Sequence, residues 1–299
     1  MKKNEVYRKY ILIILSGVLW GTIGMFIKIL YAKGSSSEYT TFLRMFFGFL
    51  LLFLITLIKE GAEAFAISRR MLFSCVLLGV VSMSINNLCY TNAVNRLGMS
   101  LAAAMLYMAP VFTAVESKLL FREKIGPKKT LALAVNVAGC MLAATGGNFS
   151  GISVSAAGLL FGLGAALAYS TQTIFGRLAT DEGSPFVVAT YNFFFAAAFT
   201  LIAARPWTTT DRLFDPEILL WGFLFGLIPT TIAYILFYSG IQGLTESSKV
   251  PVLCSVELVA AAALGVIIFD EHLTFASVAG MAMILFSIVL TSGIKICDS

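Results

Sequence analysis

The sequence predicts an all-α integral membrane fold in which ten transmembrane helices form two inverted five-helix repeats. Composition gives the first indication, because 59% of the 299 residues are hydrophobic, only 12% are charged, and mean hydropathy is +0.89. Soluble domains carry about 25% charged residues. A soluble core cannot bury this much apolar surface, so we expect a multi-pass protein whose surroundings are the lipid bilayer.

A duplicated motif gives the second indication. The first copy is FREKI at residues 121–125, and the second is FDEHL at residues 269–273. Each copy closes a long apolar segment and is followed by one more, but only the first copy continues into further lysines. A duplication whose copies differ in positive charge indicates two halves that enter the membrane in opposite directions.

The five segments of the first repeat, residues 1–148, are each about 20 residues long, as a membrane-spanning helix requires. They cover 10–31, 37–58, 71–95, 98–120 and 128–146. The first follows a basic N-terminus that resembles a signal peptide, but it is long enough to span and no small-residue cleavage site follows it. We therefore interpret it as an uncleaved first helix.

The second repeat, residues 149–299, contains five comparable segments. They cover 154–178, 185–204, 218–241, 246–268 and 275–294. The polar stretch 205–216 is the longest linker, and we interpret it as a surface loop. The repeats also match internally, since Gly79 and Gly226 open the third span of each half and Tyr90 and Tyr238 fall late in those spans.

Positive charge near the span ends predicts the orientation, since Lys and Arg are enriched in cytoplasmic loops. One side holds thirteen of them: Lys2, Lys3, Arg8, Lys9, Lys59, Arg69, Arg70, Arg122, Lys124, Lys128, Lys129, Arg177 and Lys295. The other side holds four: Lys33, Arg96, Arg205 and Arg212. Both termini are then expected in the cytoplasm. Since five spans per half is an odd number, Glu123 lies inside and Glu271 outside.

These features together resemble the drug/metabolite transporter (DMT) superfamily, specifically its ten-helix EamA-type branch. Trp20-Gly21 with Lys28 is similar to that family's first-helix pattern, and Arg44 to its second-helix arginine. Pro110-Val111-Phe112 is similar to its fourth-helix signature. The resemblance implies a secondary transporter of the cell inner (plasma) membrane that works by alternating access. It also implies a central cavity lined by helices 1, 3, 4, 6, 8 and 9, with helices 5 and 10 at the periphery.

Charges within the apolar segments are costly in lipid, by about 2.5–3.5 kcal/mol each on insertion scales. Glu257 is the deepest, and it is a candidate for binding a proton or a substrate amine, or for a structural hydrogen bond to a neighbouring helix. Glu116, Lys249, Lys28 and Arg44 are candidates for coupling or gating. Lys28 and Lys249 lie close enough to span ends to reach the interface instead, and Arg44 also suits an ion pair or carbonyl contact between helices.

Uncharged polar and aromatic side chains fall on the helices that the resemblance places around the cavity. With Glu257 they form the predicted substrate-binding set: Trp20, Asn87, Tyr90, Tyr107, Tyr169, Gln172, Tyr234 and Tyr238. Tyrosines also populate interface belts, and amides also join helices by hydrogen bonds. Pro229 and Pro251 lie within spans eight and nine, where a proline bends a helix either beside a site or as a tolerated kink.

The favoured function is export of small organic metabolites such as amino acids, with a possible coupling proton. One alternative is exchange of anionic or phosphorylated substrates by Lys28, Arg44 and Lys249, and another is a membrane sensor or scaffold. We expect no enzyme activity, cofactor or metal, since the sequence has one histidine and no phosphate-binding loop. We expect no nucleic-acid partner, and a monomer or homodimer.

Overall fold

The computed structural model describes residues 3–148, 155–205, 208, 213–270 and 272–292. Within these ranges the chain is helical and contains no strand. Nine helical segments of this described part are long and apolar enough to cross a membrane. They are Asn4–Ala32, Ser37–Glu60, Arg69–Leu97, Leu101–Phe121, Ala156–Thr180, Pro185–Ala203, Pro216–Ile241, Ser247–Phe269 and Phe275–Ser292. The predicted all-helical membrane fold is therefore confirmed.

Several spans are built from more than one helix. The first half contains α1 (Lys3–Trp20), α2 (Ile23–Ala32), α3 (Ser37–Glu60), η1 (Ala62–Phe65), α4 (Arg69–Leu77), η2 (Leu78–Ile85), α5 (Asn86–Leu97), α6 (Met99–Leu106), α7 (Ala109–Phe121) and α8 (Pro127–Thr145). The second half contains α9 (Ala156–Thr180), α10 (Pro185–Ala204), α11 (Pro216–Gly226), η4 (Leu227–Ile232), α12 (Ala233–Ile241), η5 (Ser247–Lys249), α13 (Val250–Cys254), α14 (Val256–Phe269) and α15 (Phe275–Ser292).

The predicted fifth span, 128–146, forms helix α8 but falls outside the segments that meet the spanning criterion, so the count of ten is not confirmed. The helix begins with Pro127, continues with two lysines, and carries the buried Asn136. It packs lengthwise against α15. A Cβ atom on Gly139 would lie 2.8 Å from the carbonyl oxygen of Gly280, so glycine allows the two backbones to touch.

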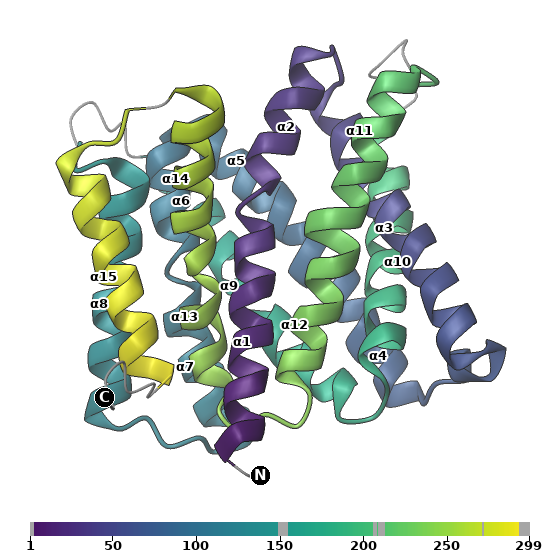
Figure 1. Ribbon diagram of the computed structural model, residues 1–299, viewed down its shortest axis with the longest axis horizontal. Helices are drawn as coiled ribbons and strands as arrows, with labels where there is room; N and C mark the ends of the chain where they lie inside the picture. The colour runs from purple at the N-terminus through teal and green to yellow at the C-terminus, as the bar shows by residue number, and fades with distance from the viewer. Residues whose placement is uncertain (1–2, 149–154, 206–207, 209–212, 271, 293–299) are drawn as a thin grey trace.

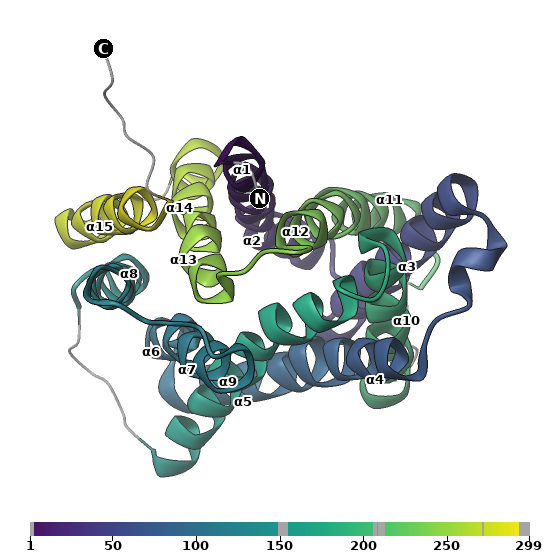
Figure 2. The same ribbon diagram turned by 90° about the horizontal axis from the view of Figure 1, so that it is seen from below.

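The helices form two layers, and the halves of the chain are interleaved between them (Figures 1 and 2). Helix α1 packs against α12, α13 and α14, which all belong to the second half. Helix α9 packs against α4, α5 and α7 of the first half, and α3 packs against α10 and α11. Neither half could therefore keep its arrangement without the other.

Two π-helical segments occupy equivalent positions in the third and eighth spans. In η2 the Ser84 hydroxyl donates to the Gly79 carbonyl at 2.9 Å, and in η4 Thr230 and Thr231 donate to Phe225 and Gly226 at 3.1 and 2.8 Å. Each hydroxyl reaches a carbonyl five residues back. Such wide turns are frequent at functional sites. Pro229 lies within η4, and Pro251 lies in α13 just before the break to α14.

The duplicated loops end their helices in the same way on opposite faces of the molecule. Arg122 after α7 and Asp270 after α14 both adopt the left-handed conformation, with φ of 53° and 51°. Helices often end on such a residue, although glycine is usual. The first loop lies on the face where α1 begins, called here the N-terminal face, and the second lies on the opposite face (Figure 1). Glu271 is outside the described residues.

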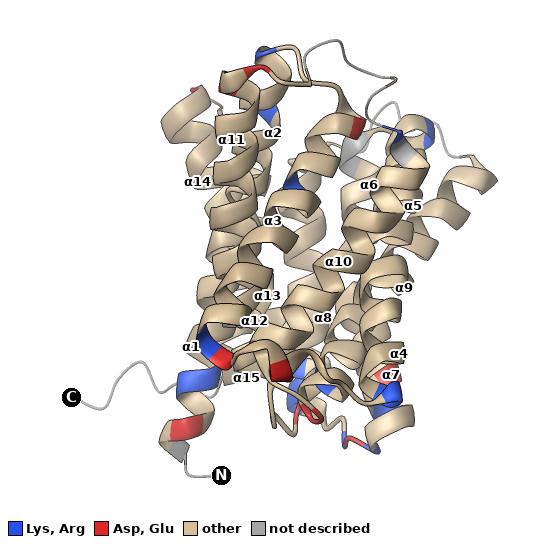
Figure 3. Cartoon of the chain, turned by 90° about the vertical axis from the view of Figure 1, so that its right-hand side faces the viewer, with Lys and Arg blue, Asp and Glu red and all other residues tan. Residues whose placement is uncertain are grey.

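Charged residues gather at these two faces, and the stretches between them are almost free of charge (Figure 3). This distribution is what a bilayer requires, since charged side chains are expensive in its core. Exposed apolar side chains such as Leu54, Leu160 and Phe286 cover the intervening surface. The architecture thus places a lipid-facing belt around a bundle whose rare interior charges need a separate explanation.

Candidate functional site

A cavity of about 150 Å³ lies between the two layers of helices. Seven of the residues predicted for binding, coupling or gating line it: Trp20, Arg44, Asn87, Tyr169, Gln172, Tyr234 and Glu257. They come from α1, α3, α5, α9, α12 and α14, which lie far apart along the chain. Among the described residues that line this cavity, Glu257 is the only acidic and Arg44 the only basic one, and the fold brings them to one place.

Arg44 reaches the cavity from α3 and is held on two sides by the second half of the chain. Its Nε atom donates a hydrogen bond to Thr230 Oγ1 at 3.2 Å, and its guanidinium carbon lies 5.3 Å from the centre of the Phe225 ring. Guanidinium has five N–H donors. Because one donor is used by Thr230, the others are available to a ligand in the cavity.

Glu257 enters the cavity from the first turn of α14, immediately after the break that follows α13. The break between α1 and α2, which contains Gly21, packs against this first turn of α14. A Cβ atom on Gly21 would lie 2.8 Å from the Glu257 carbonyl oxygen and 2.6 Å from the Ala260 Cβ atom. Glycine at this position therefore lets the first span approach the ninth beside its carboxylate. The Tyr107 side chain also lies next to that carboxylate.

No ion pair within 4.0 Å joins Arg44 to Glu257, although both are among the described residues. The two charges thus face one cavity without neutralising each other directly. Opposite charges inside a membrane protein usually pair or mark a substrate path. Here the space between them is open to a solute that carries complementary charges.

Aromatic rings form the wall of the cavity near Trp20. The Trp20 ring centre lies 5.1 Å from those of both Tyr234 and Phe237. Its indole Nε1 is buried and has no hydrogen-bond partner among the described residues, and the same holds for Gln172 Oε1. Buried polar groups are normally satisfied. One donor and one acceptor are therefore available at the cavity wall.

The other six predicted residues do not line this cavity, and four of them are Tyr90, Tyr107, Tyr238 and Glu116. Tyr107 and Tyr90 lie within electrostatic range of Glu257, and Tyr107 is the nearer of the two. Tyr238 is fully buried and its hydroxyl accepts a hydrogen bond from Asn192 Nδ2 at 2.8 Å. Glu116 accepts a hydrogen bond from the Ser170 hydroxyl at 2.7 Å, in the interface between α7 and α9.

Lys28 and Lys249 lie near opposite faces of the molecule. The Lys28 Nζ atom is 4.4 Å from the centre of the Phe269 ring at the end of α14. The Lys249 Nζ atom forms an ion pair with Glu246 at 2.6 Å and donates to the Tyr10 hydroxyl at 3.2 Å. The three basic residues Lys28, Arg44 and Lys249 therefore do not converge on one site.

Sequence reasoning missed several cavity residues. They are Ile23, Ser82, Met83, Asn86 and Leu106. Ser82 and Met83 lie in the π-helical η2 segment, and the widened turn has no clear signature in the sequence. The resemblance did not place the second helix at the cavity, although Arg44 reaches it from there. An arginine in an apolar segment was nonetheless a signal that could have located it.

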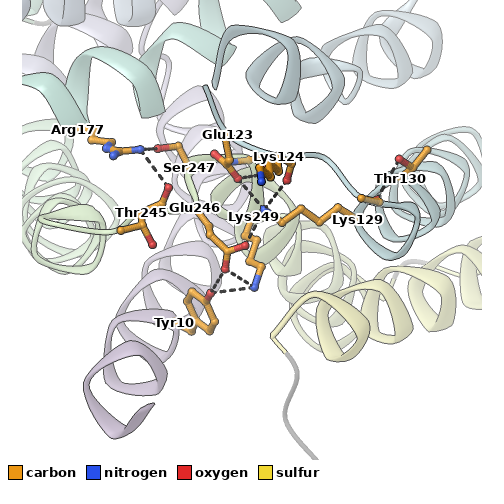
Figure 4. A network of polar contacts seen from close by, with 12 residues as sticks. Tyr10, Glu123, Lys124, Lys129, Thr130, Arg177, Thr245, Glu246, Ser247 and Lys249 are labelled. Carbon is orange, nitrogen blue, oxygen red and sulfur yellow. Dashed lines mark hydrogen bonds and ion pairs between the residues drawn. The ribbon is translucent and has the colours of Figure 1, made fainter. Parts of the chain in front are cut away.

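A network of polar side chains closes the N-terminal face and joins the two halves (Figure 4). Glu123, only 8% exposed, accepts hydrogen bonds from the backbone N–H of Ser248 at 3.2 Å and from the Ser248 hydroxyl. It also forms an ion pair with Lys129 at 2.9 Å. Lys129 continues to Glu246 at 2.6 Å, which brings the loop before α13 against the start of α8.

Arg177 extends this network along α9. Its Nη1 atom donates to Ser247 Oγ at 2.9 Å, and its guanidinium carbon lies 4.0 Å from the Phe121 ring centre. Burial alone would raise the pKa of Glu246, but hydrogen bonds from Lys129 and Lys249 outweigh burial and hold that pKa below its usual value. Glu246 is therefore a carboxylate shared by two ammonium groups.

Comparison with known proteins agrees with this arrangement. The model of the EamA-like transporter family matches the chain twice, over residues 8–145 and 156–293. An uncharacterized transporter of Archaeoglobus fulgidus is 28% identical over 278 residues, which cover 93% of this chain and 94% of the relative. The inner membrane transporter YicL of Salmonella typhimurium is 24% identical, with 94% and 93% covered.

One more distant relative and one solved structure are also similar to this chain. The transporter YwfM of Bacillus subtilis is 22% identical over 97% of this chain and 95% of its own length. A solved crystal structure superimposes with a TM-score of 0.77 at 16% identity, covering 94% of this chain and 95% of the other, and this likeness shows the fold alone. With both halves matched by one family model, the chain belongs to the EamA-like transporter family and is a multi-pass membrane transporter.

Proposed function

We propose that this protein is a secondary transporter that exports small zwitterionic metabolites, such as amino acids, by alternating access around the central cavity. One observation carries the proposal: Arg44 and Glu257 line the same cavity of about 150 Å³ and form no ion pair with each other. An amino acid presents a carboxylate and an ammonium group at a short separation. Arg44 is suited to the carboxylate and Glu257 to the ammonium group.

The closed N-terminal face supports alternating access. We propose that this face is cytoplasmic, because it carries most of the Lys and Arg residues near span ends. The Glu123–Ser248 and Lys129–Glu246 contacts cross between the halves and must break before a solute can enter from that side. Rocking of one set of helices against the other would exchange these contacts for closure at the opposite face.

Glu257 is the proposed coupling residue. It is the only carboxylate among the described residues that line the cavity, and a proton and a substrate amine would compete for its oxygens. Competition of this kind couples the two movements, because binding of one ligand displaces the other. Glu116 and Arg44 remain proposed gating residues, the first through its bond to Ser170 and the second through its bond to Thr230.

The test uses purified full-length protein. A thermal-shift screen against a metabolite library identifies ligands, since a ligand raises the stability of the state it binds. Counterflow of the best ligand is then measured in proteoliposomes for the wild type, Glu257→Gln and Arg44→Lys, with Glu63→Gln on the exposed η1 turn as a matched control.

We expect Arg44→Lys to weaken binding of carboxylate-bearing ligands about tenfold, because the forked contact is lost. We expect Glu257→Gln to abolish the pH dependence of flux. Unchanged pH dependence in Glu257→Gln would remove the coupling role. Equal stabilisation by ligands that lack either the amine or the carboxylate would remove the zwitterion assignment.

Exchange of phosphorylated anions is less well supported by the geometry. That function would draw on Lys28, Arg44 and Lys249 together, yet only Arg44 lines the cavity. Glu257 would also repel a polyanion. Competition of organic phosphates with the identified ligand, lost in Lys249→Ala, is the result that would favour exchange instead.

A further inference from the structure

A second and larger pocket lies between α3, α5 and α10, close to the opposite face. Its volume is about 370 Å³, within the usual range of about 300–1,000 Å³ for small-molecule sites. The start of α3, the junction of η2 with α5, and the end of α10 form its walls. Asn87 lines both this outer pocket and the central cavity, so the two spaces approach each other at this side chain.

Three of the five hydroxyl-bearing side chains that line the outer pocket donate their hydrogen within their own helix; Ser37 and Thr91 are the other two. Thr41 Oγ1 donates to the Ser37 carbonyl at 2.9 Å, and Thr200 Oγ1 donates to the Ala196 carbonyl at 2.7 Å. Ser84 in η2 likewise donates its hydrogen within its own helix. A hydroxyl group has a single hydrogen. Once that hydrogen is used by the backbone, these side chains can offer only lone pairs to a ligand.

Amide and carboxylate groups supply further acceptors. Asn92 Nδ2 donates to the Leu88 carbonyl at 2.9 Å, which uses one of its two N–H groups and leaves its Oδ1 as an acceptor. Among the described residues that line the pocket, Glu38 supplies the only charge. No ion pair of Glu38 occurs within 4.0 Å in the described ranges. Leu88 and Phe199 provide apolar surface beside these acceptors.

We propose that the outer pocket is a second binding site, selective for protonated amines that carry an apolar substituent. An ammonium group has three N–H donors and no acceptor, which complements the Glu38 carboxylate and the hydroxyl lone pairs of Thr41 and Thr200. An anion would be repelled by Glu38, although the amides of Asn87 and Asn92 carry N–H donors. The apolar substituent packs on Leu88 and Phe199, as side chains of pocket walls usually do.

The position of Asn87 suggests a role for the outer pocket in the release of substrate, and this role rests on the proposed function. Because Asn87 lines both spaces, a solute that leaves the central cavity past Asn87 would enter the outer pocket. The ammonium group would pass from Glu257 to the acceptors around Thr200 and Glu38. The outer pocket is thus the last binding station before release, and it selects for the amine end of the substrate.

The test measures binding of three probes of similar size to the full-length protein in nanodiscs by calorimetry. The probes are 2-phenylethylamine, 2-phenylethanol and 3-phenylpropionate. The variants are Thr200→Val and Thr41→Val, which keep shape but remove an acceptor, and Glu38→Gln, with Glu63→Gln as the charge control. Glu257→Gln reports on the central cavity separately.

We expect the amine to bind and the alcohol and acid to bind at least tenfold more weakly. Thr200→Val should weaken amine binding about tenfold, which corresponds to about 1.4 kcal/mol, because a charge-assisted hydrogen bond is lost. Glu38→Gln should weaken it about two- to fivefold, because Glu38 is exposed and screened. Thr41→Val should lie between them, and Glu63→Gln should leave binding unchanged.

Amine binding that survives all three pocket variants but is lost in Glu257→Gln would overturn the outer site and leave the proposed function standing. Equal binding of the acid probe would also overturn it. Conversely, amine binding that depends on Thr200 in a protein without measurable flux would retain the outer site and reject the transport proposal. The two proposals therefore fail by different measurements.

Discussion

The two faces of this transporter differ in how their polar side chains are arranged. At the N-terminal face, buried and half-buried charges from both halves interlock, with Glu123 only 8% exposed and bonded to Ser248 and Lys129. At the opposite face, the described ion pair Lys33–Glu217 lies at the surface, and the outer pocket is lined by polar side chains with one carboxylate, Glu38. A near-symmetric scaffold thus carries an interlocked network at one face and a pocket near the other.

The difference between the two faces shows how two duplicated halves with similar backbones can become functionally unequal. Both duplicated loops end their helices on a residue in the left-handed conformation, so the two copies share the same backbone conformation at this point. Their side chains differ, because Lys124 and Lys129 give the first loop a cluster of positive charge that FDEHL lacks. Symmetric backbones with asymmetric charges favour one of two otherwise comparable states.

The largest effect on this comparison is expected from Glu123→Ala. Removing the carboxylate leaves the buried Ser248 N–H without its acceptor and Lys129 with one partner fewer. We expect a loss of about 3 kcal/mol in the free energy of unfolding, as for other broken buried pairs. Titration with sodium dodecyl sulfate in mixed micelles measures it. A change as small as that of the exposed control Glu63→Ala would show that the network does not lock this face.

A smaller effect is expected midway between the faces, where Gly21 meets α14. Gly21→Ala adds a Cβ atom that would lie 2.6 Å from the Ala260 Cβ atom, so the helices must separate. Overpacking of this kind costs about 1–3 kcal/mol. Gly24→Ala is the matched control, because its added Cβ atom meets nothing within 4 Å. Equal melting temperatures for the two variants would contradict a close contact at Glu257.

Acid should weaken the N-terminal face selectively. The pKa of Glu246 is lower in the folded protein than in the unfolded chain, so the unfolded chain binds more protons as pH falls. The stabilisation by Glu246 is complete above its unfolded pKa of about 4.3 and is lost as pH falls through the folded value. We therefore expect the melting temperature of Glu246→Gln to fall less than that of the wild type as the pH is lowered. An equal fall in both proteins would argue against the pairing of Glu246 with Lys129 and Lys249.

The smallest effect is expected from Glu217→Gln at the opposite face. The Glu217 side chain is 71% exposed, and exposed ion pairs contribute about 0–1 kcal/mol. The same unfolding titration should therefore show little change, and less still at high salt. A loss as large as that of Glu123→Ala would mean that both faces are locked alike.

Much of the fold could be predicted from the sequence. Apolar length located the spans, and FREKI with FDEHL located the duplication, because lipid imposes both length and charge placement. The fifth span is the exception, since Lys128, Lys129 and Asn136 reduce the apolar character of α8. Its packing on α15 depends on Gly139 and Gly280, which a hydropathy argument does not weigh.

The site was harder to predict, because lipid-facing and protein-facing surfaces are both apolar and the sequence does not say which face points inward. Tyr169 and Tyr234 line the cavity, whereas Tyr238 on the same helix as Tyr234 is buried against Asn192. Arg44 was identified as unusual for its depth, but only the fold shows that it faces Glu257. The coupling and binding roles of these residues stay predictions.

The interleaving of the halves has a consequence for how the protein is made. Tyr10 and Glu246 hydrogen-bond across 236 positions, and Lys9 donates to the Gln242 carbonyl across 233. During synthesis, the first helix therefore enters the membrane long before α12, α13 and α14 emerge from the ribosome. Until then its basic and tyrosine side chains can be held only by water and lipid headgroups at the interface. Insertion of the last helices, rather than the first, completes the native contacts.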